Sequence, residues 1–185
     1  RDRLRSRGLG DVYKRQELAG IRVERMISEP TAAAIAYGLY EKKEDTRFLV
    51  FDLGGGTFDV SILELYQNIL EVRAVAGDNY LGGEDFTKIL EKMFLNKKGI
   101  SANALTAKEQ VRLYRQAEEA KRRINDADKV EITCLIKEEP ETVEITTKDY
   151  AEECEDLFSK IREPVKRSLS DAGLSLKDID EVALI

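Results

Sequence analysis

The chain of 185 residues contains no histidine and only two cysteines, Cys134 and Cys154. The absence of histidine excludes catalytic triads and general bases that depend on imidazole. The two cysteines do not stand at a metal-ligand spacing, so we expect two free thiols and no zinc site. Any chemistry must therefore rely on carboxylates, hydroxyls, lysine, backbone amides or a bound metal.

Long apolar runs and an excess of positive charge are also missing. No apolar run reaches transmembrane length and no secretory signal is visible, so we expect no membrane association and a reducing, cytoplasmic setting. The net charge of −6 argues against a general nucleic-acid binder, whose surface should be basic. With 36% charged and 42% hydrophobic residues, the composition is typical of a soluble globular protein of one domain or two small ones.

The most informative stretch is FLVFDLGGGTFDVSIL, from Phe48 to Leu63. Its two apolar runs are joined by Gly54, Gly55 and Gly56, which predicts a β-hairpin because glycine tolerates the positive φ angles of tight turns. Glycines also let backbone N–H groups approach a ligand with no Cβ in the way, and such a concave backbone binds phosphate oxygens. The alternative is a hairpin whose glycines serve only the turn.

The residues that flank these glycines favour the phosphate interpretation. Asp52 precedes them, and Thr57 and Asp59 follow. The Asp52 carboxylate is suited to a hydrated Mg²⁺ beside the phosphates, because hard cations prefer carboxylate and water oxygens. Upstream, the segment Ser28-Glu29-Pro30-Thr31 predicts a helix start with Glu29 in the first turn, where the helix dipole favours an anion. The alanine-rich helix that follows is slim enough to pack closely on another backbone.

A second glycine pair, Gly82-Gly83, precedes an amphipathic helix. The apolar positions of this helix follow the spacing i, i+3, i+4, i+7 and i+8, and they are Phe86, Ile89, Leu90, Met93 and Phe94. The stripe is expected to face the core. The glycine pair is either a hinge or a place where a ligand approaches the backbone.

A further helix is expected from Thr106 to Asn125. Four polar residues share one of its faces, namely Glu118, Lys121, Arg122 and Asn125. On spacing alone, this face is a solvated stripe of helix ion pairs, each worth a few tenths of a kcal/mol.

The C-terminal third predicts a second hairpin, with strands at residues 130–136 and 142–146 and a loop from Lys137 to Glu141. Thr147 is then expected to cap a long helix that Pro164 kinks. A strand begins at Glu181, and we expect the chain to stop within it as a truncated piece.

The N-terminal segment Arg1–Gln16 differs from the rest, with six basic and two acidic residues and no apolar period. A basic arm for nucleic acid is one interpretation, and a foreign or disordered leader is the one we favour. A short strand is expected around Val23 to Ile27.

Three consecutive motifs resemble those of the DnaK-type chaperones, the 70-kDa heat-shock proteins, which have the actin and sugar-kinase ATPase fold. They are ISEPTAAAIAYG (Ile27–Gly38), FDLGGGTFDVSIL (Phe51–Leu63) and AGDNYLGGEDF (Ala76–Phe86). The resemblance covers about Glu17 to Ile185 and is specific, because the motifs stand in order at the family's spacing. The second half has a shorter β-region insert and a Gly-Glu-Asp-Phe-Thr ending, and it resembles the specialised bacterial paralogues of DnaK more than DnaK itself.

The resemblance implies a site for ATP or ADP with Mg²⁺. Its second phosphate-binding loop would consist of Gly54, Gly55, Gly56 and Thr57. Asp52 would orient the hydrated Mg²⁺, and Glu29 would lie near the metal and act on it through water. Glu29, Asp52 and Thr57 are thus the expected catalytic residues.

The same resemblance reinterprets the later motifs. Gly82 and Gly83 would belong to the loop that closes over the nucleotide from the second lobe. Glu118, Lys121 and Arg122 would hold the adenosine, with their long stems packed on base and sugar. Asn125 stands where the family usually has serine, which changes the adenine contact expected there.

Other parts of the family pattern have no counterpart in these 185 residues. They include the first phosphate hairpin with its catalytic lysine, the adenine loop, the interdomain linker and the peptide-binding domain. The parent protein would hydrolyse ATP and couple hydrolysis to protein folding, with a J-domain co-chaperone and a nucleotide-exchange factor as partners and unfolded peptides bound only through the absent C-terminal domain. This chain alone is expected to hydrolyse ATP negligibly.

The expected fold is α/β, with an actin-like ATPase fold built on a ribonuclease H-like sheet and a smaller α+β subdomain. Residues 1–16 would be the leader, and 17–40 the end of the first lobe with the crossing helix. Residues 41–81 with 154–185 would form the sheet subdomain, and 82–153 the smaller outer one. Two alternatives remain open: a sugar or metabolite kinase of the same fold, and a non-enzymatic docking lobe for a nucleotide-exchange partner.

Overall fold

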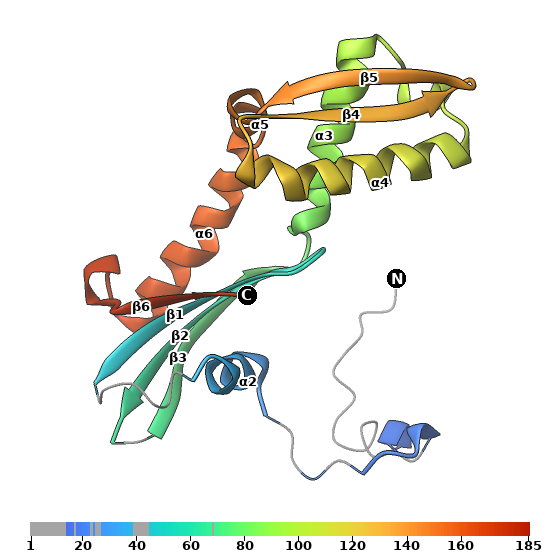
Figure 1. Ribbon diagram of the computed structural model, residues 1–185. Helices are drawn as coiled ribbons and strands as arrows, with labels where there is room; N and C mark the ends of the chain where they lie inside the picture. The colour runs from blue at the N-terminus through green and yellow to red at the C-terminus, as the bar shows by residue number, and fades with distance from the viewer. Residues whose placement is uncertain (1–13, 17, 23, 25–26, 39–44, 68) are drawn as a thin grey trace.

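A four-stranded mixed sheet carries the glycine-rich hairpin (Figure 1). In the computed structural model, which describes residues 14–16, 18–22, 24, 27–38, 45–67 and 69–185, the strand order is β3-β2-β1-β6. The strands are β1 (Thr46–Leu53), β2 (Phe58–Tyr66), β3 (Ile69–Asp78) and β6 (Glu181–Leu184). The first three run antiparallel to their neighbours, whereas β6 pairs parallel to β1. The predicted hairpin and C-terminal strand are confirmed.

The hairpin register places the flanking carboxylates opposite each other. Asp52 on β1 pairs with Asp59 on β2, and Leu53 pairs with Phe58. The turn between them is closed by the Gly54 amide, which donates to the Thr57 carbonyl at 2.9 Å. Because paired residues of antiparallel strands project from the same face, both aspartates lie on one side of the sheet.

Helices cover both faces of the sheet (Figure 1). Helix α6 (Glu155–Ala172) packs on β2 and β3, and the core on this side contains Leu49, Phe58, Val60, Ile62, Leu81, Leu157 and Leu169. Helix α2 (Glu29–Ala36) lies on the opposite face with Ser28 as its N-cap residue. Ala34 of α2 is fully buried against β1 and its neighbours, so the expected close packing of the slim helix is confirmed.

The middle of the chain forms a second body with its own core. Helices α3 (Gly83–Lys98) and α4 (Ala107–Arg123) support a two-stranded sheet of β4 (Lys129–Ile136) and β5 (Glu139–Thr146), as Figure 1 shows. Short 3₁₀ turns at Ala102–Ala104 and Ile124–Asp126 flank α4. The predicted apolar stripe of α3 is confirmed, since Leu90 and Phe94 are fully buried, and Leu113 of α4 is almost fully buried as well. The boundaries drawn at residues 41, 82 and 154 stay a prediction.

The helices in the C-terminal third of the chain begin and end at other residues than predicted. Thr146, not Thr147, caps α5 (Thr147–Glu153), because its hydroxyl accepts the Asp149 amide at 3.1 Å. The Thr147 hydroxyl instead donates to the Ala127 carbonyl at 2.7 Å. The long helix is interrupted at Cys154, between α5 and α6. Helix α6 continues through Pro164, so the kink expected there involves no break in the helix.

The β4–β5 loop and the two cysteines can also be compared with the prediction from the sequence. The loop predicted from Lys137 to Glu141 is shorter, because β4 and β5 extend until only Lys137 and Glu138 separate them. Gly173 has a φ of 68° and closes α6, after which a 3₁₀ turn at Leu176–Asp178 leads to β6. Both cysteines are free and buried, as expected.

The N-terminal predictions lie largely outside the described residues. This is so for residues 1–13 of the leader, while Lys14–Gln16 are helical. Three of the five residues of the expected strand at 23–27 are likewise not described, and Glu24 and Ile27 have no regular secondary structure. Within the part of the chain that the structure describes, no helix has the length and apolar character needed to cross a bilayer.

Candidate functional site

The glycine turn of the hairpin does not require glycine for its own conformation. None of Gly54, Gly55 and Gly56 has a φ in the left-handed region, which would favour glycine over other residues. A Cβ at Gly55 or at Gly56 would meet no heavy atom within 4 Å. Neither φ nor crowding thus calls for glycine at Gly55 and Gly56, and the space beside their backbone is open to a ligand. The phosphate interpretation stays a prediction.

Three backbone donors of the turn have no internal partner. Among the described residues, the amides of Gly55, Gly56 and Thr57 have no hydrogen-bond acceptor, whereas the Gly54 amide closes the turn. All four residues of the turn except Gly54 are exposed. Free amides beside an unobstructed glycine backbone are the donor set that phosphate oxygens need, so the residues present fit a phosphate group.

Three carboxylates line one pocket beside the turn. The pocket has a volume of about 190 Å³ and brings together Glu29 from the first turn of α2, Asp52 from β1 and Asp59 from β2. Ser61, Val50, Val75, Pro30, Ala33 and Ile185 complete its lining. Carboxylates of like charge gathered in this way suit a hard cation.

The carboxylate pocket does not form a direct metal cage. Within the described ranges, no three side chains of histidine, cysteine, aspartate or glutamate come close enough to coordinate one ion together. Mg²⁺ commonly retains several of its waters and takes only one or two carboxylates from a protein. The arrangement thus fits a cation held through water more readily than one enclosed by protein oxygens.

The Gly82-Gly83 segment docks onto the glycine turn. The Gly83 amide donates to the Gly54 carbonyl at 2.9 Å, and the Glu84 amide donates to the Gly55 carbonyl at 2.8 Å. A Cβ at Gly82 would overlap the Gly55 carbonyl and would lie 2.5 Å from the Gly56 Cα. Close approach of the Gly55 and Gly56 backbone therefore explains the glycine at Gly82, whereas the two predicted roles of the pair, a hinge or a ligand contact, stay predictions.

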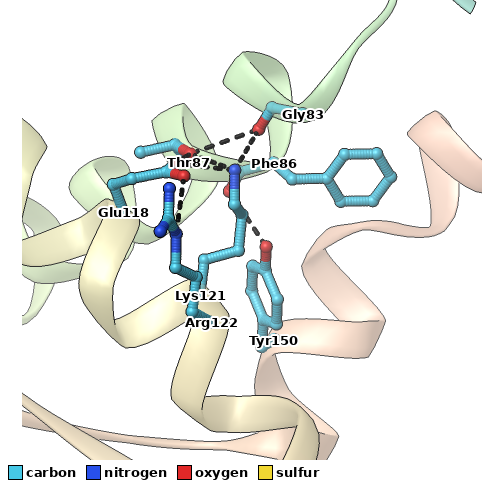
Figure 2. A network of polar contacts seen from close by, with 7 residues as sticks. All are labelled: Gly83, Phe86, Thr87, Glu118, Lys121, Arg122 and Tyr150. Atoms are coloured by element: carbon cyan, nitrogen blue, oxygen red, sulfur yellow. Dashed lines mark hydrogen bonds and ion pairs between the residues drawn. The ribbon is translucent and has the colours of Figure 1, made fainter. Parts of the chain in front are cut away.

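The predicted polar face of α4 meets the same segment (Figure 2). The Lys121 ammonium donates to the Gly83 carbonyl at 2.9 Å and forms an ion pair of 2.7 Å with Glu118. Arg122 lies 3.4 Å from the other oxygen of the Glu118 carboxylate and is 76% exposed. The ion-pair interpretation of this face is therefore confirmed, but the pair also reaches across to the glycine segment.

Thr87 is the residue of this network that the sequence did not single out. Its side chain is fully buried, donates to Glu118 at 2.6 Å and accepts from Lys121 at 2.9 Å. A signal was present, since Thr87 precedes Leu90 and Phe94 by three and seven residues and so falls on the buried stripe of α3. A buried hydroxyl on an apolar stripe requires partners, and here it finds them on α4.

The electrostatics of the network favour a charged Glu118. Hydrogen bonds from Lys121 and then from Thr87 hold the pKa of the Glu118 carboxyl below its usual value. The Tyr150 hydroxyl of α5 donates to the Phe86 carbonyl at 3.1 Å, and burial raises the pKa of Tyr150 (Figure 2). The first turn of α3 is thereby held from two helices.

The structure thus assembles two groups of predicted residues, namely the glycine turn with its carboxylate pocket and the polar face of α4. Gly83 connects the two groups. Its amide binds the glycine turn and its carbonyl binds Lys121 of α4. Asn125 is not part of either group, because it is exposed and, among the residues that the structure describes, its amide donates only to Asp126, at 3.4 Å. The roles assigned to Glu29, Asp52 and Thr57 stay predictions.

Comparison with known proteins agrees with the motifs. The profile of the family described as "Hsp70 protein" matches residues 11–185, and so begins upstream of Glu17. Heat shock 70 kDa protein 2 of Paracoccidioides lutzii is 44% identical over 177 residues, which cover 91% of this chain and 27% of that protein. A heat shock 70 kDa protein of Penicillium citrinum is also 44% identical over 177 residues, covering 91% of this chain and 35% of that protein.

The chain spans only part of these relatives. The covered share is 27% of the Paracoccidioides protein, 35% of the Penicillium protein and 27% of a heat shock 70 kDa protein from Emericella nidulans. The relatives are fungal, and the narrower similarity to bacterial paralogues of DnaK stays a prediction.

Proposed function

This chain belongs to the Hsp70 family, and we propose that it contributes the phosphate and adenosine contacts of one lobe to the nucleotide site of a chaperone ATPase. The domain of this family has an actin-like ATPase fold, with which the mixed sheet and its helices agree. The glycine turn carries the proposal. Its free amides at Gly55, Gly56 and Thr57 stand in a backbone that needs no glycine for its own conformation.

The phosphates of ATP or ADP would be bound at this turn. The amides of Gly55, Gly56 and Thr57 would donate to phosphate oxygens, and the Thr57 hydroxyl is exposed beside them. Asp52 and Glu29 would accept hydrogen bonds from the waters of Mg²⁺, since both line the carboxylate pocket. When bound, Mg²⁺ would neutralise part of the negative charge of the phosphates.

The adenosine end would be held on α4. Glu118 and Lys121 are oriented by Thr87 and Gly83, and the exposed Arg122 guanidinium can pack on the base with its planar face. Gly82 and Gly83 would close over the nucleotide because they lie between the glycine turn and α4. Asn125 would offer both a donor and an acceptor to the base.

The activity of the whole protein is part of the proposal. We propose that it hydrolyses ATP in the cytoplasm and couples hydrolysis to protein folding, with a J-domain co-chaperone, a nucleotide-exchange factor and unfolded peptides as partners. Phosphoryl transfer depends on positioning and charge stabilisation from all sides of the phosphates. The 185-residue chain would contact the phosphates from one side only, so we expect its own ATP turnover to be negligible. Turnover equal to that of a full-length relative, measured as phosphate release, would contradict this.

Binding of Mg²⁺-ADP by calorimetry tests the proposed site, with Gly55→Val as the decisive variant. A Cβ at Gly55 would meet no heavy atom of the protein within 4 Å, so we expect the variant to keep the thermal unfolding temperature of the wild type while the valine occupies the phosphate space. We expect at least about a tenfold loss of affinity for ADP and for inorganic pyrophosphate, because contacts to charged phosphates are lost.

Two further variants complete the design. Arg122→Ala should weaken ADP but leave pyrophosphate unaffected, since Arg122 would contact only the nucleoside. Ala104→Val, exposed on the 3₁₀ turn before α4, serves as the distant control and should bind both ligands normally. Unchanged ADP affinity in Gly55→Val would refute the assignment of the glycine turn.

A further inference from the structure

We propose that Thr87 is a positioning residue for nucleoside recognition, which acts by holding the Glu118 carboxylate and the Lys121 ammonium in place. The proposal rests on the function proposed above for Glu118 and Lys121. Thr87 itself is fully buried and touches no ligand, so its contribution must pass through these two side chains.

The Thr87 hydroxyl has two acceptors within reach, the Glu118 carboxylate at 2.6 Å and the Gly83 carbonyl at 3.2 Å. Its single proton is donated to Glu118, because that acceptor is closer and charged. The ammonium of Lys121 has three protons and donates to the Thr87 oxygen at 2.9 Å. Thr87 is therefore both a donor to the anion and an acceptor from the cation of the same ion pair.

The contacts leave one side of the Glu118 carboxylate for a ligand. Thr87 and Lys121 both bind Oε2, whereas Oε1 has only the long 3.4 Å contact with Arg122, which is itself 76% exposed. Glu118 retains 28% of its side-chain exposure. A carboxylate fixed through one oxygen presents the other in a defined direction, and Figure 2 shows Thr87 and Lys121 converging on it from α3 and α4.

Thr87 also joins recognition of the nucleoside to the glycine segment. It lies one helical turn after Gly83, to whose carbonyl Lys121 donates at 2.9 Å. Gly83 in turn donates from its amide to the glycine turn. Losing the hydroxyl would leave Lys121 with Gly83 and Glu118 as partners but would release Glu118 from α3.

The test compares Thr87→Val, which keeps the shape of the side chain, with Thr87→Ser, which keeps the hydroxyl. We expect Thr87→Val to bind Mg²⁺-ADP about tenfold more weakly, because a hydrogen bond to a charged group is lost, while Mg²⁺-pyrophosphate is bound normally. Thr87→Ser should recover most of the ADP affinity. Thr133→Val is the matched control, since it removes an exposed threonine hydroxyl from β4, and it should bind as the wild type does.

The pH profile separates positioning from general loss of structure. Without the Thr87 hydrogen bond, the pKa of Glu118 should rise towards its usual value, so the loss of ADP affinity on acidification should begin at a higher pH in Thr87→Val than in the wild type. A merely structural role would lower affinity at every pH without moving the profile.

The outcomes distinguish the two proposals. If the wild type binds ADP and Thr87→Val binds it with the same affinity, the role of Thr87 is overturned and the proposed function stands. No binding of ADP or pyrophosphate by the folded wild type overturns both. If Thr87→Val does not fold, Thr87→Ala is compared with Thr87→Ser: weaker ADP binding by the alanine variant alone supports the role of Thr87, and equal ADP affinity of the two variants overturns it.

Discussion

Gly56 and Gly82 lie against each other in the candidate site but leave very different room for a side chain. A Cβ on Gly82 would overlap the backbone of Gly55 and Gly56, whereas a Cβ on Gly56 would point into open space. We expect Gly82→Ala to lower the free energy of unfolding by about 1–3 kcal/mol, because rigid backbone must move. Urea denaturation measures this, and Gly56→Ala is the matched control with a change below about 0.5 kcal/mol. Equal effects would contradict the docking of the two segments.

Glu109 links residue-level electrostatics to folding stability. Hydrogen bonds from the Lys137 amide at 2.7 Å and from Thr106 lower the pKa of its carboxyl from 4.5 to about 2. Because the pKa is lowered in the folded state, the stabilisation is complete above about pH 4.5 and is lost as the pH falls towards about 2.

The variant Glu109→Gln removes this titration. Its free energy of unfolding should depend less on pH between about 4.5 and 2 than that of the wild type. Urea denaturation at a series of pH values measures the difference. Glu119→Gln, an exposed neighbour on the same helix, should keep the wild-type pH dependence. Parallel curves for Glu109→Gln and the wild type would show that the carboxylate does not bridge α4 and the β4–β5 turn.

At the scale of elements, the β4–β5 turn is built from unfavourable residues. Lys137 and Glu138 have φ values of 51° and 67°, which two-residue hairpins commonly need but which side chains with a Cβ adopt at a cost. Replacing the pair by Asn-Gly should stabilise the protein by up to about 1 kcal/mol, since these residues suit a type I′ turn. Thermal unfolding tests this, and an unchanged or lower midpoint would count against the turn geometry.

Element identity could be predicted from sequence because each element has a local pattern. The glycine hairpin, the apolar stripe of α3 and the β4–β5 hairpin all depend on neighbouring residues. The helix boundary near Thr147 was wrong by one residue, because two adjacent threonines can both cap and only the tertiary contact to Ala127 selects between them. The interruption at Cys154 has no local signal.

In the candidate site, too, local motifs could be predicted from the sequence, whereas contacts between distant segments could not. The motifs predicted which residues belong to the hairpin and to the polar face of α4. They did not predict that Gly83 would connect the two or that Thr87 would complete the ion pair, because both contacts join segments about 30 residues apart or more. Contacts of this kind depend on how α3 and α4 pack, which spacing within one helix does not specify.

For the whole molecule, the sheet and the outer body each carry part of one site. The phosphate turn and carboxylate pocket belong to the sheet, and the Glu118–Lys121 pair belongs to α4. Gly82 and Gly83 lie where the chain passes from one to the other. Because the chain spans 27–35% of the length of its relatives, the central claim is that this part retains its own share of nucleotide affinity.

Calorimetric titration of the 185-residue chain with ADP, in Mg²⁺ and again with the metal removed by a chelator, tests this claim most directly. We predict saturable binding to one site in Mg²⁺ and a clear loss of affinity without it, because Asp52 and Glu29 then face the phosphates with no intervening cation. A chain that is folded by circular dichroism but binds no ADP under either condition would contradict the account.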